Sequence, residues 1–336
     1  MSITNPTTIE FLIQAWGRVL RLPSVGLEDN FFDLGGNYSQ AVQLFQILSE
    51  ARGLQLPPVL IYHAPTIVSQ ACLLDNPQKY ESGPVVPLRP GQPNLIAFIA
   101  AGLGGVPADF FPIAKLIHGA YSIYGLQPKG IDGFNDPADR IEDMADFYTS
   151  AILRFQPNGP YILLGYSLGG LVFLEVARRL VRRGQKITLL VMIDSYPDFN
   201  LLSTDQRMRS FARRAKVRAL GFARATRRNM RLGSVVKADN VSTFALAFER
   251  VRDSAYIALS RYRPAFYPGT VKFIRAAEVS DFPEDAKAVW SQLVEGIQIE
   301  TVPGNHVGIV TTYHRVLTSV LNCYLEEIAN LQRSSA

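Results

Sequence analysis

Residues 161–182 read YILLGYSLGGLVFLEVARRLVR, and this stretch decides the fold of the chain. An apolar run typical of a buried strand leads through Gly165, Ser167 and Gly169 into a run of helical composition. These residues match the pattern G-x-S-x-G, in which a sharp strand-to-helix turn lifts a serine oxygen above a sheet. The glycines leave room for the turn, and the helix N-terminus favours developing negative charge. The stretch therefore predicts a strand–turn–helix unit with Ser167 as a nucleophile.

Alternating strands and helices surround this unit. The further apolar runs are LIAFIA, SIYGL, ITLLVMID, VKFIRA and IQIETV, which begin at residues 95, 122, 187, 271 and 297. Helical patterns lie around residues 110–117, 141–154 and 316–328. Continuous apolar runs separated by helices are typical of a mostly parallel sheet that is covered on both faces. This part of the chain is therefore expected to have an α/β fold.

A serine nucleophile needs a histidine base and a carboxylate that orients the imidazole. Asp194 ends the run 187–194, so its carboxylate is expected at the same edge of the sheet as Ser167. Asp198 is the weaker candidate because it lies beyond the strand end. His306 follows the last predicted strand and falls at the same edge. The order Ser, Asp, His is that of the α/β-hydrolase fold, so these three residues are expected to form a catalytic triad.

The oxyanion of an acyl-transfer intermediate needs two backbone N–H donors. Leu168, directly after the nucleophile, is expected to supply one. The second is expected from the glycine-rich loop after the run 95–100, at Gly102 or its neighbour Leu103. The loop could instead hold a phosphate, but it lacks the lysine and the glycine spacing of nucleotide-binding loops.

No metal is expected. The two cysteines, Cys72 and Cys323, are far apart in the sequence and provide neither a disulfide framework nor metal-ligand spacing. None of the four histidines has cysteine or acidic residues at ligand spacing. Those outside the expected triad are more readily explained as structural residues: His63, His118 and His314.

The net charge of +5 is concentrated between Arg207 and Arg231, where basic and apolar residues interleave. This segment predicts an amphipathic basic helix, either with a solvated face or with a surface for an anionic substrate or partner. No nucleic-acid partner is expected. The chain has no apolar run long enough to span a membrane and does not begin like a signal peptide. We therefore expect a cytoplasmic protein without a membrane partner.

Two domains are expected. Residues 1–78 show helical periodicity, which predicts a small all-α bundle, and residues 79–93 are rich in proline and glycine, as in an interdomain linker. Residues 94–336 would form the α/β domain.

Both domains carry motifs of one known assembly. In the first these are DNFFDLGG, AVQLFQIL and HAPTIVSQA, and in the second YGLQPKGIDG, IEDMADFYTSAI, GPYILLGYSLGG, IDSYPD and GNHVGI. The chain resembles a peptidyl or acyl carrier plus type I thioesterase didomain from the C-terminus of a nonribosomal peptide synthetase or a related polyketide synthase. The resemblance implies a four-helix carrier bundle, then an α/β-hydrolase fold with a helical lid over about residues 200–265.

The resemblance also implies a function. A carrier-bound acyl or peptidyl thioester would pass its acyl group to Ser167, and the product would leave by hydrolysis or cyclisation. The implied partners are upstream adenylation or condensation domains, in cis or in trans, and a phosphopantetheinyl transferase. The alternatives are a free-standing esterase or lipase, and a docking module without catalysis.

The carrier motif departs from the family pattern at one position. The family attaches 4'-phosphopantetheine to a serine two residues after the paired glycines, and here Tyr38 holds that position, with Ser39 next to it. Three interpretations stay open: a natural or introduced block of modification, use of Ser39 instead, or a docking domain that never held the cofactor. Ser39 could also simply be the N-cap of the next helix.

Overall fold

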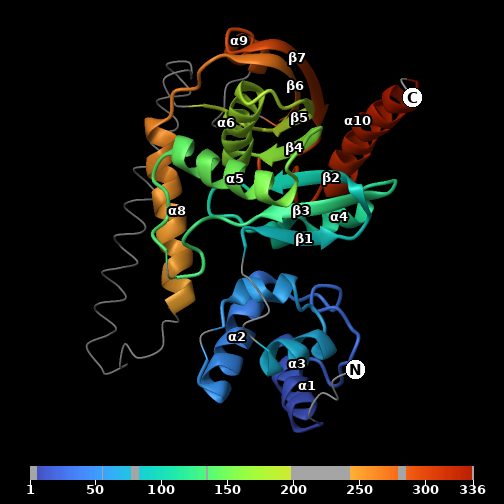
Figure 1. Ribbon diagram of the computed structural model, residues 1–336, viewed down its shortest axis with the longest axis vertical. Helices are drawn as coiled ribbons and strands as arrows, with labels where there is room; N and C mark the ends of the chain where they lie inside the picture. Colours follow the sequence, from blue (N-terminus) through green and yellow to red (C-terminus); the bar gives the residue numbers. More distant parts are fainter. Residues whose placement is uncertain are drawn as a thin grey trace.

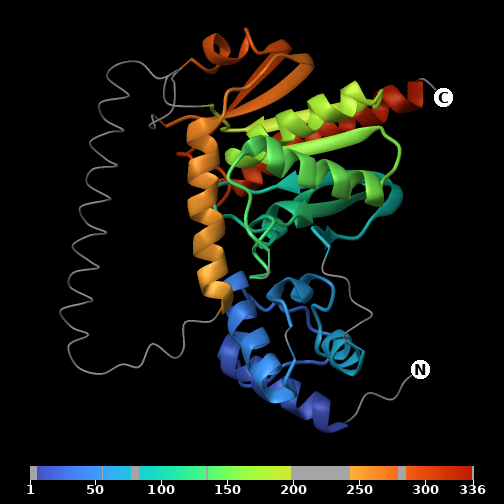
Figure 2. The ribbon, with the colours of Figure 1, turned by 60° about the vertical axis from the view of Figure 1, so that its left-hand side comes forward.

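The computed structural model of this chain describes residues 6–54, 56–76, 83–133, 135–197, 243–278 and 285–334. Residues 6–54 and 56–76, the N-terminal half, are helical, and the residues from 83 onward, the sheet half, are built on one seven-stranded sheet (Figure 1). In both views the N-terminal half lies beyond the sheet edge formed by strand β1 (Val85–Arg89) (Figures 1 and 2). Among the described helices, none has the length and apolarity needed to cross a membrane.

The N-terminal half is a bundle around large apolar side chains. Its elements are α1 (Pro6–Leu20), α2 (Tyr38–Arg52), the 3-10 helix η1 (Pro58–Tyr62) and α3 (Ile67–Asp75). At its centre the indole N–H of Trp16 donates a hydrogen bond of 2.8 Å to the Gln70 side chain, and both residues are buried. This bond ties α1 to α3, because a buried indole and a buried amide each need a partner. The predicted all-helical bundle is confirmed.

Helix α2 begins at a capping box. The Gln40 backbone N–H donates to the Asn37 side chain at 3.0 Å, and the Asn37 N–H donates to the Gln40 side chain at 3.1 Å. The prediction that Ser39 is the N-cap is therefore wrong, because Asn37 already supplies the reciprocal bonds that a helix start requires. Ser39 lies in the first turn of α2 and is exposed.

The sheet has the strand order β1-β3-β2-β4-β5-β6-β7. After β1 its strands are β2 (Gln92–Ala100), β3 (Tyr121–Leu126), β4 (Tyr161–Tyr166), β5 (Ile187–Ile193), β6 (Tyr267–Ala276) and β7 (Val294–Val302). Strand β1 is antiparallel to β3, and all other neighbouring pairs are parallel. The mostly parallel sheet is confirmed.

The interdomain linker predicted over residues 79–93 is wrong in part, because β1 and the start of β2 lie within it. Pro87 favoured the linker interpretation, because proline has no backbone N–H to donate and is therefore rare in the central strands of a sheet. Strand β1 is the edge of the sheet and pairs with β3 alone. Proline is tolerated at such an edge.

Helices cover both faces of the sheet. They are η3 (Pro107–Phe110), α4 (Phe111–Leu116), α5 (Ile141–Phe155), α6 (Leu168–Arg182), α8 (Thr243–Arg261), α9 (Ala286–Trp290) and α10 (His314–Ser334). Along β4, Ile162 and Leu164 join the core that contains α4 and α10, whereas Leu163 joins the core that contains α5 and α6. This alternation follows from the two-residue period of a strand. The sheet is therefore buried on both faces, as continuous apolar strands require.

Helix α8 is the described part of the predicted lid (about residues 200–265). Its C-terminal end is held by Glu175 of α6, a buried carboxylate that accepts a 3.0 Å hydrogen bond from the Tyr262 hydroxyl. Two arginines of α6 neutralise Glu175 at 2.7 Å each, Arg178 and Arg179. The predicted basic helix between Arg207 and Arg231 lies outside the described residues.

Candidate active site

The predicted nucleophile, Ser167, stands on the turn between β4 and α6. Its backbone has φ 53° and ψ −121°, a left-handed conformation that side-chain-bearing residues rarely adopt. Two glycines make the turn fit: a Cβ at Gly165 would collide with Gly170, and one at Gly169 would collide with the Ala100 carbonyl. The turn therefore stores local strain and holds the serine at the carboxyl edge of the sheet.

Asp194 directly follows β5 and is 2% exposed. Its own N–H donates to the Ile274 carbonyl at 2.7 Å, and its Oδ1 accepts from the Ala276 N–H at 3.1 Å. Both bonds are made to β6, so the neighbouring strand fixes the backbone and one carboxylate oxygen. The second oxygen, Oδ2, is left to face His306.

His306 lies on the loop after β7 and joins the other two side chains. Its Nδ1 is 2.7 Å from Asp194 Oδ2, and its Nε2 is 3.0 Å from Ser167 Oγ. The structure thus brings Ser167, His306 and Asp194 into one hydrogen-bonded chain. In this arrangement an imidazole can take the serine proton while the carboxylate orients the ring and stabilises its charge.

The other histidines stand in different surroundings. Burial lowers the pKa of His63, whose Nε2 has no hydrogen-bond partner among the described residues. His118 Nδ1 is 3.6 Å from the Glu326 carboxylate at the surface, and His314 Nδ1 is 2.6 Å from the Thr311 carbonyl at the start of α10. Asp198, the weaker acid candidate, lies outside the described residues.

Tyr166, the residue before the serine, contributes to the site although the sequence did not single it out. Its hydroxyl donates a 2.8 Å hydrogen bond to the His306 carbonyl, and its ring stacks on the imidazole with centroids 5.0 Å apart. Burial, with a further effect of the Asp194 carboxylate, raises the pKa of Tyr166, so the phenol stays protonated and remains a donor. The one available signal was its place inside G-x-S-x-G.

The residues expected to stabilise an oxyanion flank Ser167. A Cβ on Gly102 would lie 3.0 Å from the Ser167 Cβ, so the glycine lets the loop after β2 approach the nucleophile closely. Leu168 is the first residue of α6, where backbone N–H groups have no partner within the helix. Both positions border the space above the serine. The side chain of Leu103, the alternative, packs against the core of α5 and α6.

A cavity of about 40 Å³, part of it open to solvent, adjoins Gly102 and Leu168. Gly102 and Leu168 are among its lining residues, and apolar side chains of α5 and α8 line much of the remainder, among them Met144, Phe147 and Val251. The apolar lining of the cavity suits an apolar chain whose reacting end lies at Ser167.

Metal ligands are not gathered at this site or elsewhere in the described part of the chain, where no three histidine, cysteine or acidic side chains converge. The two residues predicted for cofactor attachment lie at the start of α2 in the N-terminal half. Tyr38 is the first residue of α2 and is only 9% exposed, whereas Ser39 beside it is exposed.

Family models match both halves of the chain. A model described as thioesterase domain matches residues 95–324, and a model described as phosphopantetheine attachment site matches residues 10–73. The second match implies phosphopantetheine attachment in the family that the N-terminal half resembles.

Similar proteins are much longer than this chain. A dimodular nonribosomal peptide synthase of Bacillus subtilis (strain 168) is 38% identical over 190 residues, 56% of this chain and 8% of that protein. The malpibaldin synthetase of Mortierella alpina is 28% identical over 304 residues, 88% of this chain and 5% of that protein. The chain therefore spans less than a tenth of the length of either relative.

Among solved structures, a four-domain holo nonribosomal peptide synthetase bound to AMP and glycine shares the fold. The similarity covers 96% of this chain and 26% of that chain, with 24% sequence identity and a TM-score of 0.58.

Proposed function

The chain belongs to the thioesterase domain family, and from this we propose that it cleaves acyl thioesters through a covalent intermediate on Ser167. The observation that carries the proposal is the hydrogen-bonded chain from Ser167 Oγ through His306 to Asp194, at 3.0 and 2.7 Å. A serine so placed is activated without a metal.

In the first half of the reaction, Ser167 Oγ attacks the thioester carbonyl and its proton passes to His306 Nε2. The carbon–sulfur bond then breaks, and the imidazolium returns the proton to the leaving thiolate. The products are a free thiol and an acyl ester on Ser167.

In the second half, His306 takes a proton from water, or from a nucleophile of the acyl chain itself, as that group attacks the ester. The proton is then returned to Ser167 Oγ. Water gives a free acid, and an internal nucleophile gives a cyclic product. Throughout, Asp194 holds the imidazole and stabilises its positive charge, and the Leu168 and Gly102 N–H groups donate hydrogen bonds to the oxyanion of each tetrahedral intermediate.

We further propose that the acyl group is the product of a nonribosomal peptide or related polyketide assembly line. The carrier-type N-terminal half and the two synthetase relatives support this context. Upstream adenylation or condensation domains, in cis or in trans, would then be its functional partners. The division into a carrier-like domain and a thioesterase domain belongs to the same proposal, with the second domain beginning at β1 and not near residue 94.

The N-terminal half does not fit the cofactor that its family carries. The attachment position holds a phenol instead of a serine hydroxyl, and Tyr38 is nine-tenths buried. Burial also raises its pKa, which makes the phenol a poorer nucleophile. Ser39 is exposed, but it is one residue away from that position. We therefore assign no step of the reaction to a phosphopantetheine on this chain.

Two measurements test the proposed function. A fluorophosphonate should label Ser167 in the full chain and leave the Ser167→Ala variant unlabelled, as judged by intact mass. A panel of acyl N-acetylcysteamine thioesters should then be turned over, with products identified by mass spectrometry. Turnover of matched oxygen esters alone would point to an esterase. Failure of labelling together with absence of any turnover would point to a non-catalytic docking module.

A further inference from the structure

The N-terminal half and the sheet half share a packed aromatic boundary. Phe32 stacks on Phe111 of α4 with ring centroids 4.2 Å apart, and Tyr62 also stacks on Phe111. The Ala108 N–H donates a 2.9 Å hydrogen bond to the Tyr62 hydroxyl, and at the rim Asp33 forms an ion pair with Lys115. Ring stacking and this part-buried hydrogen bond supply most of the stabilisation of the boundary, because an exposed ion pair contributes little.

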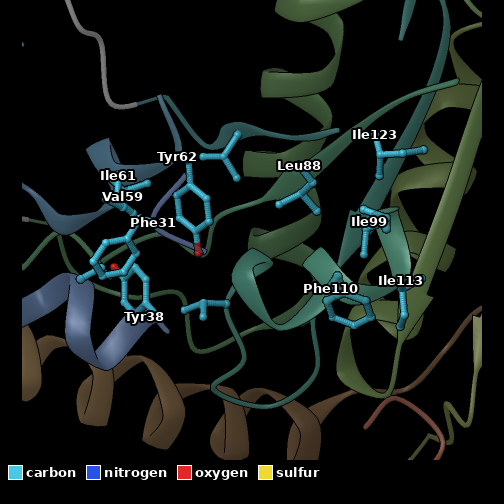
Figure 3. Packing of buried hydrophobic residues seen from close by; sticks show 14 of the residues in the cluster. Phe31, Tyr38, Val59, Ile61, Tyr62, Leu88, Ile99, Phe110, Ile113 and Ile123 are labelled. Atoms are coloured by element: carbon cyan, nitrogen blue, oxygen red, sulfur yellow. The ribbon is translucent and has the colours of Figure 1, made fainter. Parts of the chain in front are cut away.

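One hydrophobic cluster runs through this boundary. Figure 3 shows part of it, with Tyr38 and Tyr62 from the N-terminal half and Leu88 and Phe110 from the sheet half. Within the cluster Tyr62 is 3% exposed and Leu88 is 6% exposed. The two halves therefore bury side chains against each other as the elements of one domain do.

Tyr38, the residue at the attachment position, is part of this boundary. Its ring stacks on Tyr62 with centroids 6.2 Å apart, and its phenol neighbours the buried Gln127 amide. Gln127 directly precedes Pro128 and Lys129, which line the cavity beside Ser167. The side chain that would carry a pantetheine arm in a working carrier is thus replaced by a ring that packs at the margin of the cavity.

A working carrier needs the opposite properties at this position. Its attachment hydroxyl must be accessible to a transferase, and the carrier must dissociate from one partner domain to bind the next. A nine-tenths buried phenol in an aromatic stack meets neither requirement. We infer that the N-terminal half is a fixed cap on the sheet half, held there by the contacts of Phe32 and Tyr62 with Tyr38 packed behind the Tyr62 ring, and that the acyl group reaches Ser167 on a pantetheine thioester supplied from outside this chain. This inference rests on the proposed function.

The cavity is compatible with such a supply. Every residue that lines it lies between Ala101 and Ala255, so the cap stands beside the cavity and contributes none of its walls. A pantetheine thioester such as an acyl coenzyme A carries no carrier domain and therefore needs no docking face. Because the carrier-type half of this chain lies on the face around Phe111, a separate loaded carrier that uses the same face would have to compete with it.

The first test is modification. The full chain is incubated with coenzyme A and a broad-specificity phosphopantetheinyl transferase, and intact mass is measured for the wild type, Ser39→Ala and Tyr38→Ser. We expect no mass gain for the first two and one added phosphopantetheine for Tyr38→Ser. A gain by the wild type that Ser39→Ala abolishes would overturn the inference.

The second test is the fixed seating of the cap. Cys72 and Cys323 lie one in each half, so nitroxide labels on these native residues report the distance between the halves by electron resonance. The wild type should give one narrow distance distribution. Tyr38→Ser should broaden it, and so should Phe111→Ala, which removes the stack from the sheet side without altering the N-terminal half. A wild-type distribution as broad as that of Phe111→Ala would refute a fixed cap.

The third test is the source of the acyl group. The same acyl group is offered as its coenzyme A thioester and on a separate serine-bearing carrier domain. Tyr38→Ser should raise kcat/KM for the carrier-bound donor roughly tenfold and leave the coenzyme A value unchanged, because release of the cap frees the docking face. Equal values for wild type and Tyr38→Ser with the carrier-bound donor would count against the cap. Absence of turnover with both donors, while mass and distance behave as expected, would refute the proposed function alone.

Discussion

Tyr166 provides the sharpest test of how the fold positions the base. Tyr166→Phe keeps the ring that stacks on His306 and removes only the hydroxyl that donates to the His306 carbonyl at 2.8 Å. A neutral hydrogen bond of this kind contributes about 0.5–1.5 kcal/mol. If the bond holds His306 in its reactive position, the same free energy is lost from the transition state, which lowers kcat roughly 2- to 13-fold.

The assay is steady-state hydrolysis of an acyl N-acetylcysteamine thioester, with kcat and KM measured separately and thermal unfolding alongside. Tyr161→Phe is the matched control. Tyr161 lies on the same strand and its hydroxyl also donates to a backbone carbonyl at 2.8 Å, that of Gln156, at the end of β4 opposite Ser167. Both variants should lose similar stability, and only Tyr166→Phe should lose kcat. Equal kcat for the two variants would refute a positioning role for the Tyr166 hydroxyl.

Three further changes probe other parts of the molecule. Asp194→Asn should lower kcat by about 10⁴-fold because the imidazole loses its charged partner, and a loss below tenfold would contradict the role given to Asp194. Gly102→Pro removes one N–H donor beside Ser167 and should cost about 10²- to 10³-fold in kcat; a full rate would show that the second donor lies elsewhere. Burial lowers the pKa of His63 from 6.5, so the unfolded chain binds a proton more readily than the folded one. The contribution of neutral His63 to the free energy of unfolding is therefore complete above pH 6.5 and decreases as the pH falls below that value. Thermal unfolding at pH 7.5 and 5.5 should show a smaller difference for His63→Gln than for the wild type.

Local sequence carried much of the fold. The apolar runs are continuous and do not alternate with polar residues, so they predict strands covered on both faces. The pattern G-x-S-x-G needs only its flanking strand and helix to place Ser167. Strand ends also pointed to Asp194 and His306, because parallel strands bring their carboxyl ends to one edge. Strand β1 could not be predicted in this way. Its proline resembles a linker residue until the strand is known to be an edge.

Other features depend on residues that are distant in the sequence. Nothing near Tyr166 shows that its hydroxyl meets the His306 carbonyl, since 140 residues separate them and the sheet alone brings them together. The N-cap of α2 is not such a feature, because Asn37 and Gln40 are three residues apart and form a capping-box pattern that the sequence itself contains.

Position 38 shows most clearly which features follow from the sequence and which follow from the tertiary structure. The sequence by itself determined that a tyrosine stands where the carrier family has serine, since this follows from register alone. Only the tertiary structure decided where that ring goes: against Tyr62, in the boundary with the sheet half and beside Gln127. The physical reason is that Tyr38 stacks on a residue 24 positions away and packs beside one 89 positions away, and no local pattern encodes such contacts.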